Sequence, residues 1–260
     1  MAYPSILFGP ESEVFNDYAA VTPAPGNNGS GGAIAQRGRH ALGQQLILQD
    51  GRKYRFSRVG GTALVRGNVL TSAAIITTDQ SMALAVGAVD DRILTFTHGA
   101  ATVVINYFAE GFGVISLAPG SGLAYKIASH AALQSAVAGD IVNLAPGVRV
   151  RVALTTTSDL SLLANTYDGL IQAAATTLTG APVGIAHTVT AANRFCWVQT
   201  KGLASVLTAG VLVVGANAIS PTGVAGAAGP SGAATSAHVG IVQMVEADTE
   251  WSGIFLTIDG

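Results

Sequence analysis

The chain has 260 residues, of which 11% are charged and 49% hydrophobic, and its formal net charge is −2. The charged fraction is well below the roughly 25% of an ordinary soluble domain. This composition excludes a disordered chain, which combines low hydrophobicity with high net charge, and it leaves few charged side chains to cover the surface of a monomer. We therefore expect one large or two smaller folded domains whose surface is partly covered by other chains.

Residues 1–40 differ in composition from the rest and are expected to form an extended N-terminal arm. Prolines punctuate them, and residues 26–32 form a glycine-rich flexible tract. Single apolar residues recur along this segment, among them Tyr3, Phe8, Phe15 and Tyr18. An arm that lies along a neighbouring subunit has this composition. An N-terminal strand of the same domain is the alternative.

From residue 42 onward the sequence predicts β-structure. The runs 45–49 and 52–59 flank Asp50-Gly51, and Asp-Gly between two β-forming runs is among the strongest short signals of a hairpin. The expected turn has positive φ at both central residues. Helix signals are weak: Ser129–Ala138 is a candidate for a short helix, and Ser72–Ile76 is ambiguous between helix and strand.

Most of the other strand candidates are short, rich in Val, Ile, Leu, Thr and aromatic residues, and bounded by turn residues. They are 63–70, 81–86, 92–97, 102–107, 113–117, 123–128, 141–144, 148–154, 160–163, 183–189, 195–200, 205–214, 238–245 and 251–258. Their spacing predicts an all-β protein, mainly of antiparallel β-barrel or sandwich modules with long Gly/Ala-rich loops. We expect two β-rich domains after the arm, at 41–150 and 151–260.

Two segments of the chain resemble each other. Tyr54-x-Phe56-x4-Gly61-x-Ala63 has the same spacing as Phe195-x-Trp197-x4-Gly202-x-Ala204. The similarity either marks two related β-modules or reflects a common hairpin type that arises twice. A second Gly/Ala-rich stretch, Gly223–Ala234, is expected to form a surface loop.

No signature of catalysis or of cofactor binding is present. The sequence contains no phosphate-binding loop and no Gly-x-Ser-x-Gly turn, and no strand precedes the glycine tract as a dinucleotide site requires. The five histidines lack metal-ligand spacing, and Cys196, the one cysteine, is expected to be a small core residue. We therefore predict a non-enzymatic protein with no catalytic, cofactor-binding or metal-binding residues.

Three carboxylates alternate at Glu246, Asp248 and Glu250, just before Trp251. On a strand they would share one face. Such a face is either a solvated edge or a site neutralised by a cation, although hard cations usually take more oxygen ligands than three side chains supply.

Positive charge is concentrated between residues 37 and 66. This segment contains Arg37, Arg39, Arg52, Lys53, Arg55, Arg58 and Arg66, opposed by Asp50 alone. Such an asymmetry indicates a charged face, for which nucleic acid, an acidic protein surface or plain solvent are the alternatives. The overall pI of about 6.2 favours a protein partner over nucleic acid.

We expect neither a membrane span nor a secretion signal. The most apolar stretch, 203–219, is interrupted by Ser, Thr, Gly and Asn, whereas a spanning helix needs about 20 predominantly apolar residues. The N-terminus lacks the basic region and apolar run of a signal peptide.

The order of several segments resembles a family of small structural proteins encoded among the head genes of tailed bacteriophages, the capsid decoration or cement proteins. The segments that carry the resemblance are 165–171, 179–184, 195–200, 207–210, 238–241, 248–251 and 255–259, with a looser likeness over the Asp50-Gly51 hairpin and 63–70. The resemblance covers residues 42–260 through weak motifs in a consistent order. It brings no catalytic residues with it.

The resemblance implies a location on the virion, at the outer surface of the capsid. There the protein would bind the major capsid protein and itself, as a homotrimer, and would brace the shell by bridging capsomers. We expect contacts through the aromatic residues of the arm and through the basic strand: Tyr3, Phe8, Phe15, Tyr18, Arg52, Arg55 and Arg58. The alternative is a tail or fibre component that binds the host surface.

Overall fold

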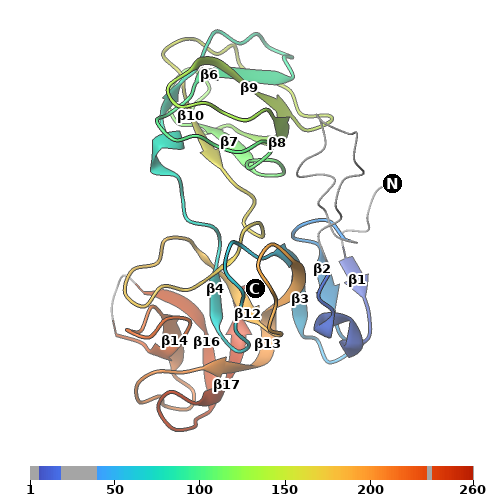
Figure 1. Ribbon diagram of the computed structural model, residues 1–260, viewed down its shortest axis with the longest axis vertical. Coiled ribbons are helices and arrows are strands. Elements are labelled where there is room, and N and C mark those ends of the chain that lie inside the picture. The colour runs from blue at the N-terminus through green and yellow to red at the C-terminus, as the bar shows by residue number, and fades with distance from the viewer. Residues whose placement is uncertain (1–5, 19–39, 233–235, 260) are drawn as a thin grey trace. The chain divides into compact units, whose positions relative to one another are not determined.

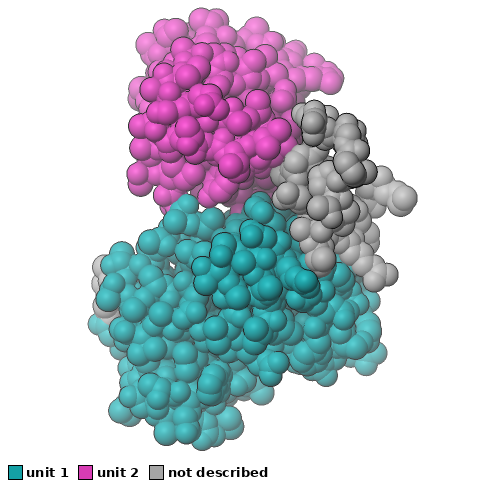
Figure 2. All heavy atoms as spheres, viewed as in Figure 1, with its two compact units in different colours: residues 1–20, 37–74, 166–260 teal, residues 21–36, 75–165 magenta. Residues whose placement is uncertain are grey.

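The computed structural model describes residues 6–18, 40–232 and 236–259, and within them the chain forms two compact units (Figures 1 and 2). Unit 1 contains residues 6–18, 40–74 and 166–259, and unit 2 contains residues 75–165. This division differs from the linear one expected at residue 150, because strands from both halves of the sequence pair within unit 1. The predicted all-β class with antiparallel sheets is confirmed.

Unit 1 is built on one large sheet in which every pair of strands is antiparallel except β1 and β2. Its strands are β1 (Ile6–Phe8), β2 (Gln45–Ile47), β3 (Lys53–Arg58), β4 (Val69–Thr71), β11 (Ile171–Gln172), β12 (Pro182–Ala186), β13 (Phe195–Leu207), β14 (Asn217–Ser220), β15 (Gly229–Pro230), β16 (Ala237–Met244) and β17 (Trp251–Thr257). The main path runs β1-β2-β3-β13-β17-β16-β14-β15, while β4, β11 and β12 form a branch that joins at β13.

The hairpin predicted around Asp50-Gly51 is confirmed, as β2 pairs with β3. Its turn differs from the expected one, because among its two central residues only Gly51 has positive φ. The backbone nitrogen of Gly51 donates to the oxygen of Leu48, and the nitrogen of Leu48 donates to the oxygen of Arg52. The loop between Leu48 and Arg52 therefore has three residues and not two, and Gly51 occupies its left-handed position.

The two similar aromatic segments lie beside each other in one sheet. Phe56 pairs with Trp197 across β3 and β13, and Tyr54 pairs with Gln199. The Phe56 ring stacks on Phe195 at 5.6 Å between centroids and meets Trp197 edge-on at 5.1 Å. The similarity therefore corresponds to two paired strands of one aromatic core, not to one strand in each of two modules.

The N-terminal residues 6–18 belong to unit 1. Strand β1 pairs with β2, the 3-10 helix η1 (Glu11–Phe15) buries Val14 completely, and Tyr18 exchanges two backbone hydrogen bonds with Phe195. This part of the predicted arm is thus an N-terminal strand of the same domain, which was the alternative. The remainder of 1–40, including Tyr3, lies outside the described residues except for His40.

Unit 2 is a curled six-stranded antiparallel sheet around its own apolar core. Unit 2 begins with the 3-10 helix η2 (Thr77–Asp79). The strands of its sheet are β5 (Met82–Ala83), β6 (Ile93–Thr97), β7 (Phe112–Ile115), β8 (Ala124–His130), β9 (Ala138–Leu144) and β10 (Asp159–Leu163). An isolated bridge between Leu84 and Phe96 joins the two ends of the sheet, next to β5 and within β6. The curl leaves little of the backbone edge unpaired.

Several local predictions in and near unit 2 are wrong. The segment 129–138 is not a helix, because it contains the end of β8, a turn bridged through Leu133 and the start of β9. The segments 102–107 and 148–154 make single bridges, at Val103 and Leu154, instead of strands. Val103 is buried in the first segment and Val150 and Leu154 in the second, while the residues next to them are mostly exposed, so the β-forming composition reflects burial and not continuous pairing.

The Gly/Ala-rich stretch is also not a simple surface loop. Ala227 and Ala228 are completely buried, and β15 pairs with β14. A Cβ atom built at Gly226 would lie 2.6 Å from the side-chain nitrogen of Asn68, so a larger residue does not fit there. The small residues serve close packing, which composition alone does not distinguish from a flexible loop. Residues 233 and 234 of this stretch lie outside the described part.

Candidate binding groove

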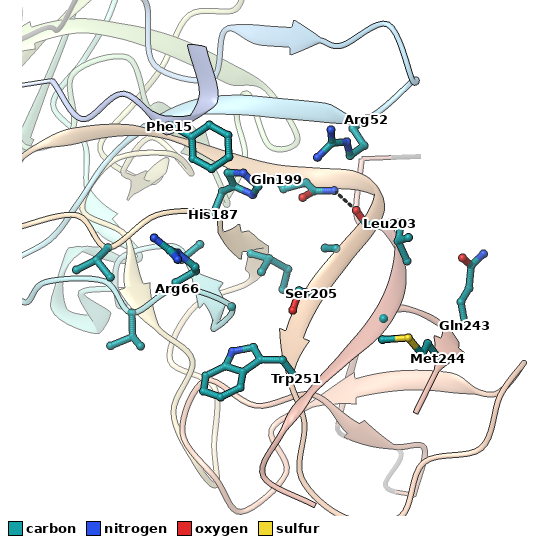
Figure 3. Close-up of a pocket in the computed structure, with 17 residues that line it drawn as sticks. Phe15, Arg52, Arg66, His187, Gln199, Leu203, Ser205, Gln243, Met244 and Trp251 are labelled. Carbon is teal, nitrogen blue, oxygen red and sulfur yellow. Dashed lines mark hydrogen bonds between the residues drawn. The ribbon is translucent and has the colours of Figure 1, made fainter. Parts of the chain in front are cut away.

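Unit 1 carries a groove with a volume of about 1120 Å³ (Figure 3). Its floor is formed by Leu203 and Ser205 of β13 together with Gly253 of β17. In the view of Figure 3, Phe15 and Trp251 lie on opposite sides with Ser205 between them. Both aromatic side chains are about half exposed, so the groove offers unusually accessible apolar surface.

The exposed side chains of the groove follow from the alternation of β13. Ala204 and Val206 point into the core of unit 1, which leaves Leu203 and Ser205 on the outer face. An antiparallel sheet that faces water on one side normally carries polar residues there. The outer face of this sheet instead exposes Leu203 and, across β17, Met244.

The wall opposite Phe15 depends on Gly67. Its nitrogen donates to the oxygen of Ala186 at 2.8 Å, and its oxygen accepts from the nitrogen of Leu207 at 2.8 Å, which ties this turn to β12 and β13. A Cβ atom built at Gly67 would lie 2.3 Å from Nε1 of Trp251, and the φ angle of +79° also favours glycine. Glycine therefore lets the indole of Trp251 lie against the turn that carries Arg66.

The side-chain amide of Gln199 lines another part of the groove and is held in place by hydrogen bonds. The Nε2 atom of Gln199 donates to the backbone oxygens of Lys201 at 3.2 Å and Leu203 at 2.9 Å, and its Oε1 atom accepts from the hydroxyl of Tyr54 at 3.3 Å. Burial raises the pKa of Tyr54 to about 12, so this hydroxyl stays protonated and keeps donating. The amide of Gln199 thus shapes the groove and has little hydrogen-bonding capacity left for a ligand.

The groove has a positive electrostatic character. Among the described residues, no Asp or Glu lines it, whereas Arg52 and Arg66 do. Arg52 is neutralised by Glu11 at 2.5 Å and Asp50 at 2.6 Å, whereas Arg66 forms no ion pair with any described residue. Arg66 is therefore the cation that the groove offers to a ligand.

His187 adds an uncharged aromatic ring at neutral pH. Its ring centroid lies 4.7 Å from that of Phe15, and its Nε2 atom is buried without a hydrogen-bond partner among the described residues. Burial lowers the pKa of His187, and the positive charge of Arg52 lowers it further. A neutral imidazole here extends the apolar surface around Phe15.

These groups are suited to holding an apolar chain with an anion near Arg66. They include no nucleophile beside a general base, and among the described residues no group of three His, Cys, Asp or Glu side chains could hold a metal ion. Cys196 is buried in the core, where burial raises its pKa to about 12, so its thiol is not the reactive kind.

The predicted interface residues fall into different environments. Phe15 lines the groove, Phe8 is exposed on β1, and Tyr18 packs against Phe56 at 5.6 Å inside the domain. The Tyr18 hydroxyl also donates to Glu13. Of the three described aromatic residues, Tyr18 is therefore a structural anchor within unit 1, and Phe8 and Phe15 are free to meet a partner.

The arginines of the basic strand are engaged within the chain. Arg55 makes a bidentate ion pair with Asp259, at 2.7 and 2.8 Å, and Arg58 pairs with Asp168, whose side chain is nearly buried. Arg52 is paired as described above. The positive segment thus meets acidic residues of its own chain, an outcome not considered among the alternatives.

The three alternating carboxylates lie on the loop that joins β16 to β17 and not on a strand. They share no strand face, and the part of the chain that the structure describes provides no metal-binding cluster that includes them. Asp248 accepts a hydrogen bond from the backbone nitrogen of Gly210 at 2.8 Å. Glu246 and Glu250 make no ion pair with a described residue.

The groove itself was not predicted from the sequence. Trp251, Arg66 and His187 come from three distant segments, and each looks ordinary in its own context. The one sequence feature that could have indicated a binding surface was Trp251, which follows the carboxylates of residues 246–250 at the start of a predicted strand.

In the described residues, no helix is long and apolar enough to span a membrane. Comparison with protein-family models, with curated proteins and with solved structures gave no match for the chain.

Proposed function

We propose that this protein is a structural, non-enzymatic component of a tailed-phage virion that decorates the outer surface of the capsid. It binds the major capsid protein as a homotrimer and stabilises the shell by bridging capsomers. The observation that carries the proposal is a surface that is poor in charge and rich in exposed apolar side chains. A soluble monomer rarely leaves such side chains in large contiguous patches, whereas a protein permanently covered by neighbours has reason to do so.

Two further apolar projections support a role in protein contact. Phe8, at the end of the edge strand β1, is 81% exposed. In the turn after β13, Val211 is 84% exposed and Val213 64%, while Leu212 between them is buried and holds the turn in place. Each fully covered valine or phenylalanine side chain contributes about 1.5–3 kcal/mol to an interface. Repetition over many copies would add substantially to shell stability.

The structure of residues 6–18 changes the proposed way in which the N-terminal aromatic residues contact a partner. A flexible arm loses conformational entropy when it docks, whereas Phe8 is presented by a strand already fixed through β2 and Val14. We therefore propose Phe8 as a rigid contact residue. The internal pairing of Arg52, Arg55 and Arg58 also disfavours nucleic acid as the partner, because binding phosphate would require these ion pairs to break.

The experiment that tests the proposal measures binding of purified, labelled full-length protein to empty mature capsids of the phage that encodes it. Saturation at a copy number that matches a set of capsid lattice positions is expected. Absence of saturable binding, or a few copies confined to the tail vertex, would overturn the proposal in favour of a tail or fibre component that binds the host surface.

A matched pair of variants sharpens the measurement. Phe8→Asp should weaken capsid binding, since it places a charge where an apolar side chain is covered. Ala132→Asp adds the same single negative charge at an exposed position in unit 2 and serves as a control for a general effect of added negative charge. Equal loss in both variants would indicate non-specific electrostatics instead of an apolar contact.

A further inference from the structure

The loop between β16 and β17 is acidic, apolar and exposed. Residues 245–250 contain Glu246, Asp248 and Glu250 and no basic residue, and every residue from Gln243 to Trp251 is exposed. Met244 and Trp251, which flank the loop, expose about half of their surface. The end of this hairpin therefore combines negative charge with apolar side chains that remain about half exposed.

Hydrogen bonds hold this loop in one shape. The nitrogen of Thr249 donates to the oxygen of Thr208 at 3.0 Å, the nitrogen of Thr208 donates to the oxygen of Glu250 at 2.9 Å, and Asp248 accepts from the nitrogen of Gly210. Asp248 is used internally, so Glu246 and Glu250 carry the available negative charge. A loop that is already ordered loses little conformational entropy when it binds.

The groove of unit 1 has the complementary properties. Its exposed apolar side chains include Phe15, Val65, Val189 and Leu203. Within the described part of the chain, Arg66 is an unpaired cation of the lining and no carboxylate lines the groove. The hairpin end and the groove are also contiguous, since Met244 and Trp251 belong to both. One surface patch thus contains both an acidic projection and a basic recess.

We propose that the groove of one copy receives the 245–250 hairpin loop of a second copy, with Glu246 and Glu250 next to Arg66 and the apolar flanks packed between Phe15 and Trp251. Because the two complementary surfaces share one patch, two copies exchange their loops reciprocally, which is a two-fold contact that links pairs of copies and does not itself build the trimer proposed above. The inference rests on the multimeric role proposed above, for which it names the self-association surface, and it does not require contact with a capsid.

Charge exchange between copies provides the test. Sedimentation velocity of the full-length wild type, over a series of concentrations, is expected to show a reversible or stable multimer. Arg66→Glu alone, and Glu246→Lys with Glu250→Lys, should each weaken association by about tenfold or more, because like charges then meet in the interface. Arg92→Glu, at an exposed position in unit 2, makes the same charge change outside the patch and should leave association unchanged.

Mixing the two charge-reversed proteins is the decisive step. The Arg66→Glu copy has an acidic groove and an acidic loop, whereas the Glu246→Lys, Glu250→Lys copy has a basic groove and a basic loop. Both contacts between unlike copies therefore pair opposite charges, and the equimolar mixture should form the two-fold pair that neither protein forms alone. Higher salt should weaken this mixed multimer.

A second readout follows the apolar part of the contact. Trp251 is 49% exposed and Trp197 is fully buried, so concentration-dependent protection from acrylamide quenching reports on Trp251. A wild type that stays monomeric, or a multimer that Arg66→Glu leaves intact, would overturn the inference and assign the groove to another partner. Capsid binding by the folded Arg66→Glu monomer would show that decoration itself does not depend on this surface.

Discussion

The charges of unit 1 fall into two regions that behave differently. On β3 and its flanks, Arg52, Arg55 and Arg58 are each paired with a carboxylate from a distant segment of the same chain: Glu11, Asp259 and Asp168, respectively. Around the groove, Arg66 and the carboxylates of Glu246 and Glu250 have no such partner among the described residues. In a chain with so few charges, paired charges connect distant segments, and unpaired charges mark surfaces available to another molecule.

The largest effect is expected at the most buried arginine–carboxylate pair of unit 1. Arg58→Met removes the partner of Asp168, whose side chain is only 8% exposed, and leaves a carboxylate without its counter-charge. We expect a loss of about 2–4 kcal/mol in the free energy of unfolding, measured by urea denaturation at neutral pH.

The double variant Arg58→Met, Asp168→Asn provides the control for that prediction. With the charge of Asp168 removed as well, part of the stability should return, because no unpaired carboxylate remains buried. A single variant as stable as the wild type would show that Arg58 does not hold the 167–170 segment to β3, and the comparison between paired and unpaired charges would lose its strongest case.

The Arg55–Asp259 pair should have a smaller and pH-dependent effect. Burial alone would raise the pKa of Asp259, but hydrogen bonds from Arg55 and its charge outweigh this, so the pKa lies below its ordinary value of 3.8. A carboxyl whose pKa is lower in the folded state stabilises the fold above its unfolded pKa and loses that contribution as the pH falls through the folded value.

We therefore expect Arg55→Met to cost about 1–2 kcal/mol at pH 7, since the pair is bidentate but partly exposed. The difference from the wild type should shrink below about pH 4, as Asp259 becomes protonated. Denaturant unfolding at a series of pH values measures this. Arg92→Met, which removes an exposed arginine in unit 2, should show no such pH-dependent difference. A constant cost at all pH values would point to lost packing instead of lost charge.

These pairs also show what the sequence could and could not predict. Alternation and turn residues located most strands, including the β2–β3 hairpin, because those signals are local. The pairing of β3 with β13 depends on residues nearly 150 positions apart, and the ion pairs of the basic strand depend on the same long-range fold. Composition showed that positive charge was concentrated there, but not that Asp168 and Asp259 would neutralise it.

The groove was hidden for a related reason. Its key residues are common types in unremarkable local contexts, and only the fold brings Arg66, His187 and Trp251 to one surface. Phe15 was selected from the sequence as a contact residue and does line the groove, whereas Tyr18, selected on the same grounds, is packed inside unit 1. Sparse aromatic residues in an irregular segment thus do not reveal which of them face a core.

A still smaller effect on stability is expected at Gly67. Gly67→Ala puts a Cβ atom into the space of the Trp251 indole and into a left-handed backbone conformation, at a cost of about 1 kcal/mol. Trp251 must shift to make room, so its fluorescence and its acrylamide quenching should change while that of the buried Trp197 does not. Gly61→Ala, where a Cβ atom meets nothing within 4 Å, is the control. An unchanged Trp251 signal would contradict the proposed support of the groove wall.

The smallest effect on stability should come from the residue that matters most for association. Arg66 is exposed and unpaired among the described residues, and its charge only adds to the lowering of the pKa of His187. Arg66→Glu should therefore change the free energy of unfolding by less than about 0.5 kcal/mol, measured at a concentration where the wild type is monomeric, because self-association would otherwise stabilise the wild type by mass action. A large loss in the monomer would place Arg66 with the paired, structural charges of β3. If Arg66→Glu abolishes the multimer but leaves the free energy of unfolding of the monomer unchanged, the charges of the groove serve association and those of β3 serve folding.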